Sequence, residues 1–248
     1  LGDTSALAKD GEGMYPETIC PGGSDLPLQR NGARLGNRDA DALGLPHKSL
    51  VGIPWRVALA LQSDGWTIRQ DIVWAKGISF LDGYSGAMKP ESVLDRPSRS
   101  HEYVFALTKG PDYYWDRDAD VEGLRVGDGV RNVRSVWAIP IEPSRYKDFV
   151  ALPERLVRAC VMLATCEGGT CARCGSQWAR KDKEHGWGPS CDCGPDVVPA
   201  IVLDPFGGSG TTAVSCERLG RDWVLFEMSG RYGDVWRERT GRRSIFRT

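Results

Sequence analysis

The chain has 248 residues, of which 41% are hydrophobic and 26% are charged, and its formal net charge is -1. This length can bury a sizeable core in one large domain or two small ones. No apolar run approaches the roughly 20 residues that cross a bilayer, so we expect no membrane span and a cytoplasmic location. Eight cysteines without a secretory leader pattern indicate reduced thiols or a metal site rather than a disulfide framework.

Patterns in the first half of the chain predict loops, one helix and a pair of strands. Residues 1–47 combine glycines, prolines and scattered charges without periodicity, so we expect a loop there. The elements expected after it are a helix over 50–62 that Gly65 ends, a strand over 67–75, a strand over 101–108, and residues 113–115 as the partner strand of 101–108.

The second half has a clearer order of elements. A helix opens at Pro153 and is expected to end at Gly168 and Gly169. The last 49 residues read as a buried strand over 200–204, a glycine-rich turn, a helix over 211–219, a strand over 222–227 and a final helix. The order strand, helix, strand predicts an α/β fold with a parallel sheet and a right-handed crossover.

The glycine-rich turn lies in the stretch VLDPFGGSGTT, residues 202–212, between a predicted strand and a predicted helix. Backbone amides at a helix N-terminus are free to donate to a negative ligand group, and glycines let ligand atoms approach the backbone. Glu227 closes the next strand, where a carboxylate can accept both hydroxyls of a ribose. The pattern predicts a pocket for an adenosine-containing cofactor.

Two other cofactor classes, and a turn that serves only packing, compete with this interpretation. GSGTTA at residues 208–213 also fits a dinucleotide fingerprint for NAD or FAD. Against it, only 21 residues follow Glu227, and Asp204 places a carboxylate where pyrophosphate would bind. The carboxylate of Asp204 instead suits the ammonium group of S-adenosylmethionine, and no Gly-Lys-Ser or Gly-Lys-Thr supports a P-loop.

The motif DPFGGSGTT at residues 204–212 strongly resembles the cofactor motif of amino-group DNA methyltransferases, which make N6-methyladenine or N4-methylcytosine. Other segments are similar to the middle region of that family and to the motif that precedes its cofactor strand: residues 50–56, 70–76, 90–103, 113–116 and 149–154. The cofactor motif comes last, which is similar to the permuted β-type order of the family.

The resemblance implies an incomplete Rossmann-like, S-adenosylmethionine-dependent methyltransferase fold that acts on double-stranded DNA. It implies a base flipped out of the helix and direct methyl transfer to the exocyclic amine. The residues that it assigns to the cofactor pocket are Asp204, Pro205, Phe206, Gly208, Ser209, Gly210, Thr211, Glu227, Phe149 and Pro153.

The catalytic tetrapeptide of that family contains Pro-Pro, and this chain has no Pro-Pro pair. We therefore assign no catalytic residue and expect a chain truncated at its N-terminus, so that the missing N-terminal segment, or a companion restriction nuclease, is an expected partner. The competing hypotheses are a non-catalytic DNA- or partner-binding relative and one half of a split methyltransferase.

Four cysteines form two close pairs, Cys171-x2-Cys174 and Cys191-x-Cys193, sixteen residues apart. Two such pairs complete a tetrahedral zinc site when their turns face each other, so residues 171–199 are expected to form a small zinc-ribbon-like insert with a structural Zn²⁺. Unliganded thiols and disulfides are the alternatives, and Cys166 and His185 are candidate substitute ligands.

The insert divides the chain into three predicted parts. Residues 1–170 are expected to form the target-side half of the methyltransferase domain, and residues 200–248 its cofactor-binding strand-helix-strand-helix. Within the insert, Arg180, Lys181 and Lys183 are either contacts to DNA phosphates or a solvated face.

Overall fold

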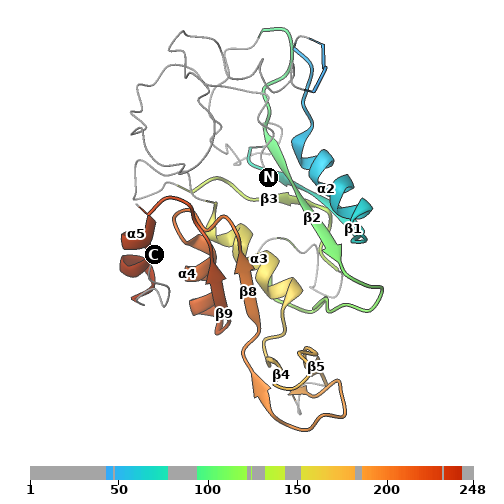
Figure 1. The fold of residues 1–248 in the computed structure, drawn as a ribbon, viewed down its shortest axis with the longest axis vertical. Helices are drawn as coiled ribbons and strands as arrows, with labels where there is room; N and C mark the ends of the chain where they lie inside the picture. The colour runs from blue at the N-terminus through green and yellow to red at the C-terminus, as the bar shows by residue number, and fades with distance from the viewer. Residues whose placement is uncertain are drawn as a thin grey trace, which may run out of the picture.

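The computed structural model describes residues 43–46, 48–77, 94–121, 124, 132–142, 152–181, 186–230 and 232–241, so the loop expected over 1–47 lies almost wholly outside the described residues. The first half of the chain forms α2 (Ile53–Ser63), β1 (Thr67–Ala75), β2 (His101–Thr108) and β3 (Val136–Ala138). The second half forms α3 (Glu154–Ala164), β4 (Thr170–Cys171), β5 (Ala179–Arg180), β6 (Trp187–Gly188), β7 (Val197–Val198), β8 (Ile201–Asp204), α4 (Thr211–Leu219), β9 (Asp222–Leu225) and α5 (Tyr232–Thr240). Figure 1 shows their arrangement.

The first sheet has the strand order β2-β1-β3, with β1 antiparallel to β2 and parallel to β3. The expected pairing of residues 113–115 with β2 is wrong, because β2 pairs along its whole length with β1, from Thr67 opposite Thr108 to Ala75 opposite His101. Residues 113–115 form no strand. The chain there runs to the end of α3 instead, where the Asp116 amide donates to the Leu163 carbonyl at 2.9 Å.

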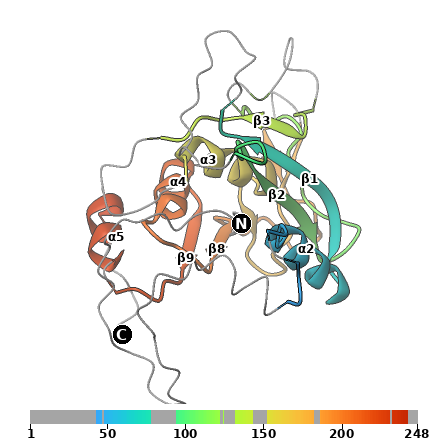
Figure 2. The same cartoon turned by 90° about the horizontal axis from the view of Figure 1, so that it is seen from above.

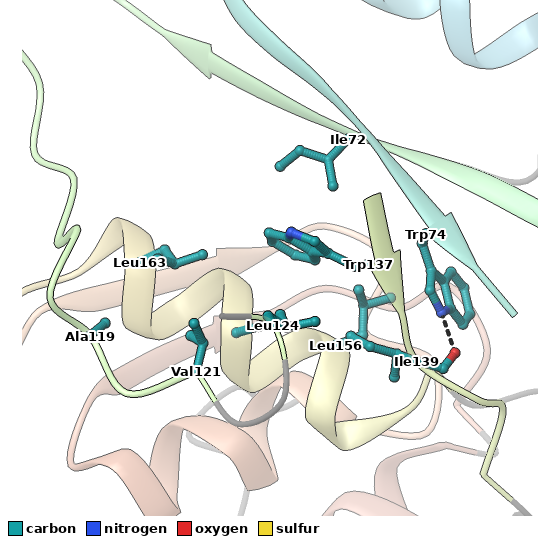
Figure 3. Close-up of a cluster of buried hydrophobic side chains, with 10 residues drawn as sticks. Ile72, Trp74, Ala119, Val121, Leu124, Trp137, Ile139, Leu156 and Leu163 are labelled. Atoms are coloured by element: carbon teal, nitrogen blue, oxygen red, sulfur yellow. Dashed lines mark hydrogen bonds between the residues drawn. The ribbon is translucent and has the colours of Figure 1, made fainter. Parts of the chain in front are cut away.

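Helices α2 and α3 cover opposite faces of this sheet, as Figure 2 shows. On one face, Trp55 of α2 makes edge contacts with Tyr103 and Phe105 of β2. On the other, the main core buries side chains from β1, the β3 region, α3 and the loop before β3 (Figure 3): Ile72, Trp74, Ala119, Val121, Leu124, Trp137, Ile139, Leu156, Ala159 and Leu163. The Trp74 indole donates to the Ile139 carbonyl at 2.7 Å, so its polar atom is satisfied inside this core.

The second sheet consists of β8 and β9, which are parallel as expected, with α4 between them in the chain. Helix α3 contributes to this half too, because Val157 and Val161 pack with Cys216 of α4, and Val202 of β8 lies against this cluster. One helix thus supports both sheets. It ends at Ala164 with Thr165 in an extended conformation, so the expected termination by Gly168 and Gly169 is wrong.

The expectation of a buried strand at β8 is also wrong. Side chains alternate between the two faces of a strand, and α3 and α4 cover one face of β8 and β9. Val202 lies on the covered face, whereas Ile201 and Leu203 are 67% and 60% exposed. Nothing in the described part of the chain packs over these two side chains closely enough to bury them.

The insert lies at one end of the molecule, beyond α3 and β8 (Figure 1). It contains two short antiparallel ribbons, β4 with β7 and β5 with β6. Among the described residues, no helix is long and apolar enough to cross a lipid bilayer.

Candidate functional site

The glycine-rich turn joins β8 to α4 and places two acidic residues at neighbouring strand ends. Asp204 is the last residue of β8, and Glu227 follows two residues after the end of β9. The two strands pair in parallel register up to Asp204 opposite Leu225. Their carboxyl ends therefore meet at one edge of the sheet, which is where parallel α/β folds bind ligands.

Both carboxylates are held in place by short hydrogen bonds. Asp204 accepts the Phe206 amide at 2.9 Å on one oxygen and the Thr212 hydroxyl at 2.6 Å on the other. Glu227 accepts the amides of Gly208 and Ser229, each at 3.0 Å and each on a separate oxygen. A carboxylate oxygen has about two lone-pair positions, so each oxygen can still accept from a ligand.

The glycines of the turn serve two different purposes. A Cβ on Gly210 would lie 2.7 Å from Cδ1 of Trp236, and one on Gly207 would lie 3.0 Å from Cζ2 of the same ring. These two glycines make room for the indole. Gly208 has a φ of 48°, and a Cβ there would meet a single atom within 4 Å, the Phe206 carbonyl oxygen at 3.8 Å. The backbone at Gly208 thus faces open space, which fits a ligand that approaches it closely.

The expectation that the amides of the turn are free is wrong for its three glycines. Gly207 donates to the Phe226 carbonyl at 2.8 Å, Gly208 donates to Glu227, and Gly210 donates to the Gly207 carbonyl at 2.8 Å. These bonds fix the shape of the turn. The amides in the first turn of α4 have no partner within the helix, so they are better suited to a negative ligand group than those of the three glycines.

Two residues of α5 support the turn, and neither was predicted from the sequence. Trp236 donates its indole hydrogen to the Gly208 carbonyl at 2.6 Å. Arg239 donates to the Ser209 carbonyl at 2.6 Å and contacts the hydroxyls of Ser209 and Thr211 at 3.2 and 3.3 Å. The sequence signal for them was weak: a tryptophan beside Val235 in a mostly polar segment, YGDVWRERT.

The other residues assigned to the pocket differ in exposure. Ser209 and Thr211 are only 4% and 6% exposed, with side chains engaged by Arg239, so they are suited to contribute main-chain atoms rather than hydroxyls. Phe206 is 79% exposed, and Pro205 next to it is exposed too. Pro153 is fully buried at the start of α3. Phe149 lies outside the described residues.

A second candidate site is the cysteine cluster, formed by Cys171, Cys174, Cys191 and Cys193, whose four sulfur atoms all lie within 4.8 Å of one another. Cys171 is buried, whereas Cys174 is exposed. Hydrogen bonding with the side chain and the backbone of Ser176 lowers the pKa of Cys174 to about 6. Cys166 is not part of the cluster, and His185 lies outside the described residues.

Two of the basic residues predicted to contact DNA, Arg180 and Lys181, have partners within the protein. Arg180 forms an ion pair with Asp116 at 3.0 Å, and its guanidinium lies 4.2 Å from the centre of the Trp187 ring. Lys181 donates to the Pro189 carbonyl at 3.1 Å. Lys183 lies outside the described residues. These contacts give Arg180 a structural role, and contact with DNA phosphates stays a prediction.

Known proteins resemble this chain in sequence and in fold. A family model described as DNA methylase matches residues 36–238. The Type II methyltransferase M.Cfr9I of Citrobacter freundii is 38% identical over 214 residues, which cover 86% of this chain and 58% of the relative. M.SmaI of Serratia marcescens is 36% identical over 220 residues, covering 88% of this chain and 62% of the relative.

A solved structure, the PvuII DNA methyltransferase (cytosine-N4-specific), superposes with a TM-score of 0.50 at 18% identity, covering 79% of this chain and 58% of that one. This likeness supports the α/β methyltransferase fold. The chain spans about three fifths of the length of the two curated relatives. The family model covers most of the chain, and the two relatives match it across most of its length, so the chain belongs to the DNA methylase family of amino-methyltransferases.

Proposed function

We propose that this chain is part of a site-specific DNA methyltransferase that uses S-adenosylmethionine to methylate the exocyclic amine of adenine (N6) or cytosine (N4) in double-stranded DNA, and that it contains most of the cofactor pocket. The observation that carries the proposal is the pair of acids, Asp204 and Glu227, at neighbouring strand ends, together with Gly208, where a Cβ would face open space. The family membership and the names of the Type II methyltransferase relatives support it.

The groups around the turn fit the parts of this cofactor. The Asp204 carboxylate is suited to the ammonium of the methionine moiety, and the Glu227 carboxylate to the two ribose hydroxyls. Phe206 and Phe226, which are 79% and 56% exposed, offer apolar surface beside these acids on which a purine ring can pack. When bound, the cofactor supplies an activated methyl group on a sulfonium sulfur.

The transfer step is proposed for the whole protein rather than for these 248 residues. The chain contains no Pro-Pro pair that matches the catalytic tetrapeptide of the family, so its own residues bind and orient the cofactor. In this proposal residues 1–170 form the target-side half, residues 171–199 an insert, and residues 200–248 the cofactor half. A companion nuclease and a cytoplasmic location stay predictions.

Calorimetry with S-adenosylmethionine tests cofactor binding on the 248-residue chain. We expect Glu227→Gln to weaken binding about tenfold, because the variant loses the charge and one acceptor oxygen. Glu238→Gln, on an exposed residue of α5, is the matched control and should bind as the unchanged chain does. Folded protein that shows no binding at millimolar cofactor would refute the proposal.

Transfer is tested with duplexes of defined sequence, a labelled methyl group and mapping of the modified base, using the whole protein. Methylation of an exocyclic amine at one sequence confirms the activity and distinguishes adenine from cytosine. Cofactor binding with transfer only after a second chain is added would favour a split enzyme. DNA binding without any transfer would favour a non-catalytic relative.

A further inference from the structure

The insert, residues 171–199, has almost no apolar interior of its own. Each of its ribbons pairs only two residues per strand. Among its described residues, 171–181 and 186–199, Cys171 is the single buried apolar side chain, at 2% exposure. Two-stranded ribbons of this length are not stable alone in water. The insert therefore needs a cross-link or a bound ion to hold its shape.

The backbone brings the two cysteine pairs to one place. The first pair sits in a tight turn, in which Gly175 donates to the Cys171 carbonyl at 2.9 Å and Cys171 donates to the Ser176 carbonyl at 2.8 Å. The second pair is followed by Gly194, with a φ of 112°. The pairing of β4 with β7 sets Cys171 opposite Val197. The chain segment just before Val197, which contains Cys191 and Cys193, therefore lies near the first pair. Two separate turns thus present their sulfur atoms to a common centre.

We propose that the cysteine cluster binds one Zn²⁺ ion through four thiolates in a closed, structural site. Four sulfur atoms at the zinc–sulfur distance of about 2.3 Å would lie about 3.8 Å apart, within the 4.8 Å limit that the cluster already meets. Four thiolates leave no position for a water molecule, so the site stabilises structure and does no chemistry. All four cysteines are free of disulfide bonds, as ligands must be.

The bound ion also orders contacts between the insert and the rest of the domain. Gln177, between the two pairs, accepts the Cys166 amide and donates to the Ala164 carbonyl at 3.0 Å, so it satisfies backbone groups at the end of α3. Arg180, also between the pairs, reaches Asp116, whose side chain is 7% exposed. The metal therefore holds both of these residues against the domain.

Metal analysis of the full 248-residue chain, purified without added chelator, tests the proposal. We expect about one Zn²⁺ per chain. Replacement by Co²⁺ should give the absorption bands of tetrahedral cobalt bound to thiolates, a readout that does not depend on any substitution. Three results would each overturn the assignment. They are iron in place of zinc, reactive thiols at all four cysteines of the cluster in folded metal-free protein, and disulfides in protein prepared under anaerobic conditions.

Substitutions then locate the site. Cys174→Ser changes an exposed ligand, so the chain should stay folded while zinc content falls at least twofold after brief dialysis against a chelator. Cys160→Ala removes a thiol of α3 outside the cluster and is the matched control, with zinc content unchanged. Equal zinc retention by both variants would contradict the proposed ligand set.

Discussion

The cofactor turn, residues 205–210, and the insert both hold irregular backbone in place, but by different means. In the turn, the glycines at 207 and 210 lie against the ring of Trp236, and backbone bonds complete the shape. In the described part of the insert, 171–181 and 186–199, Cys171 is the single buried apolar side chain, and the four sulfur atoms converge instead. The turn depends on a neighbouring helix, whereas in our proposal the insert depends on a zinc ion held by its four cysteines.

The difference implies that the two regions can be perturbed separately. Helix α5 supports the turn through Trp236 and Arg239, whereas the insert is anchored at the end of α3 and at Asp116. Effects at sites without shared partners usually add. Cofactor affinity and zinc content should therefore respond to different changes.

The largest effect is expected from removal of the metal. Binding free energy at a structural zinc site is folding free energy, on the order of 10 kcal/mol in small zinc modules. Chelation should abolish the protection of amides in 171–181 and 186–199 from hydrogen exchange, measured by mass spectrometry, while S-adenosylmethionine affinity changes less than about threefold. A loss of cofactor affinity of more than tenfold after chelation would show that the turn and the insert are not independent.

Trp236→Ala should have the next largest effect. It removes the hydrogen bond to the Gly208 carbonyl and the packing surface of two glycines. We expect about 2–3 kcal/mol lower unfolding free energy and cofactor binding weakened at least tenfold, with zinc content unchanged. Trp236→Phe should recover part of the loss, because it keeps an aromatic ring against the two glycines but lacks the indole N–H donor. Trp66→Ala, which removes a ring that contacts Lys109, is the control for cofactor affinity.

Arg180→Ala tests the contact between the insert and the domain. The change leaves the Asp116 carboxylate, 7% exposed, without its ion-pair partner. Because a buried charge without a partner is costly and Arg180 itself is 41% exposed, we expect a loss of about 1–2 kcal/mol in urea unfolding. Arg117→Ala, at a side chain that is 79% exposed, should change stability by less than about 0.5 kcal/mol. Equal effects of the two substitutions would mean that the Arg180 contact is not stabilising.

Arg239→Ala should give the smallest effect. Its guanidinium bonds the Ser209 carbonyl from one side of the turn, while Trp236 still holds the Gly208 carbonyl. We expect cofactor affinity to fall about fivefold, which corresponds to about 1 kcal/mol. Arg237→Ala, which removes an exposed ion pair with Asp234, should leave the affinity unchanged. A drop in both variants would indicate a general effect of charge rather than support of the turn.

Local patterns predict the elements whose shape depends on nearby residues. The bounds expected for β1, β2 and α4 are those of the structure, because each has a strong pattern and a clear stop. Strand β3 was not predicted, since three residues carry little signal and its pairing with β1 is distant in the chain. The segment 113–115 has strand-like composition, but its place is decided by the contact of Asp116 with α3.

The candidate site shows the same division. The motif at 204–212 predicts a turn between a strand and a helix with an acid at its start, and the structure has that arrangement. The spacing of the cysteines predicts that their sulfur atoms cluster, which is confirmed, although metal binding stays a prediction. The roles of Trp236 and Arg239 could not be predicted, because they follow from how α5 packs on the turn.

The pairing of β4 with β7 has a consequence for the length of the insert. Thr170 lies opposite Val198, so the chain leaves the end of α3 and returns to β8 at almost the same point. Because the two ends of the insert lie side by side, the insert leaves the distance between α3 and β8 unaltered. The length of such a segment can therefore differ without a change in the distance between α3 and β8.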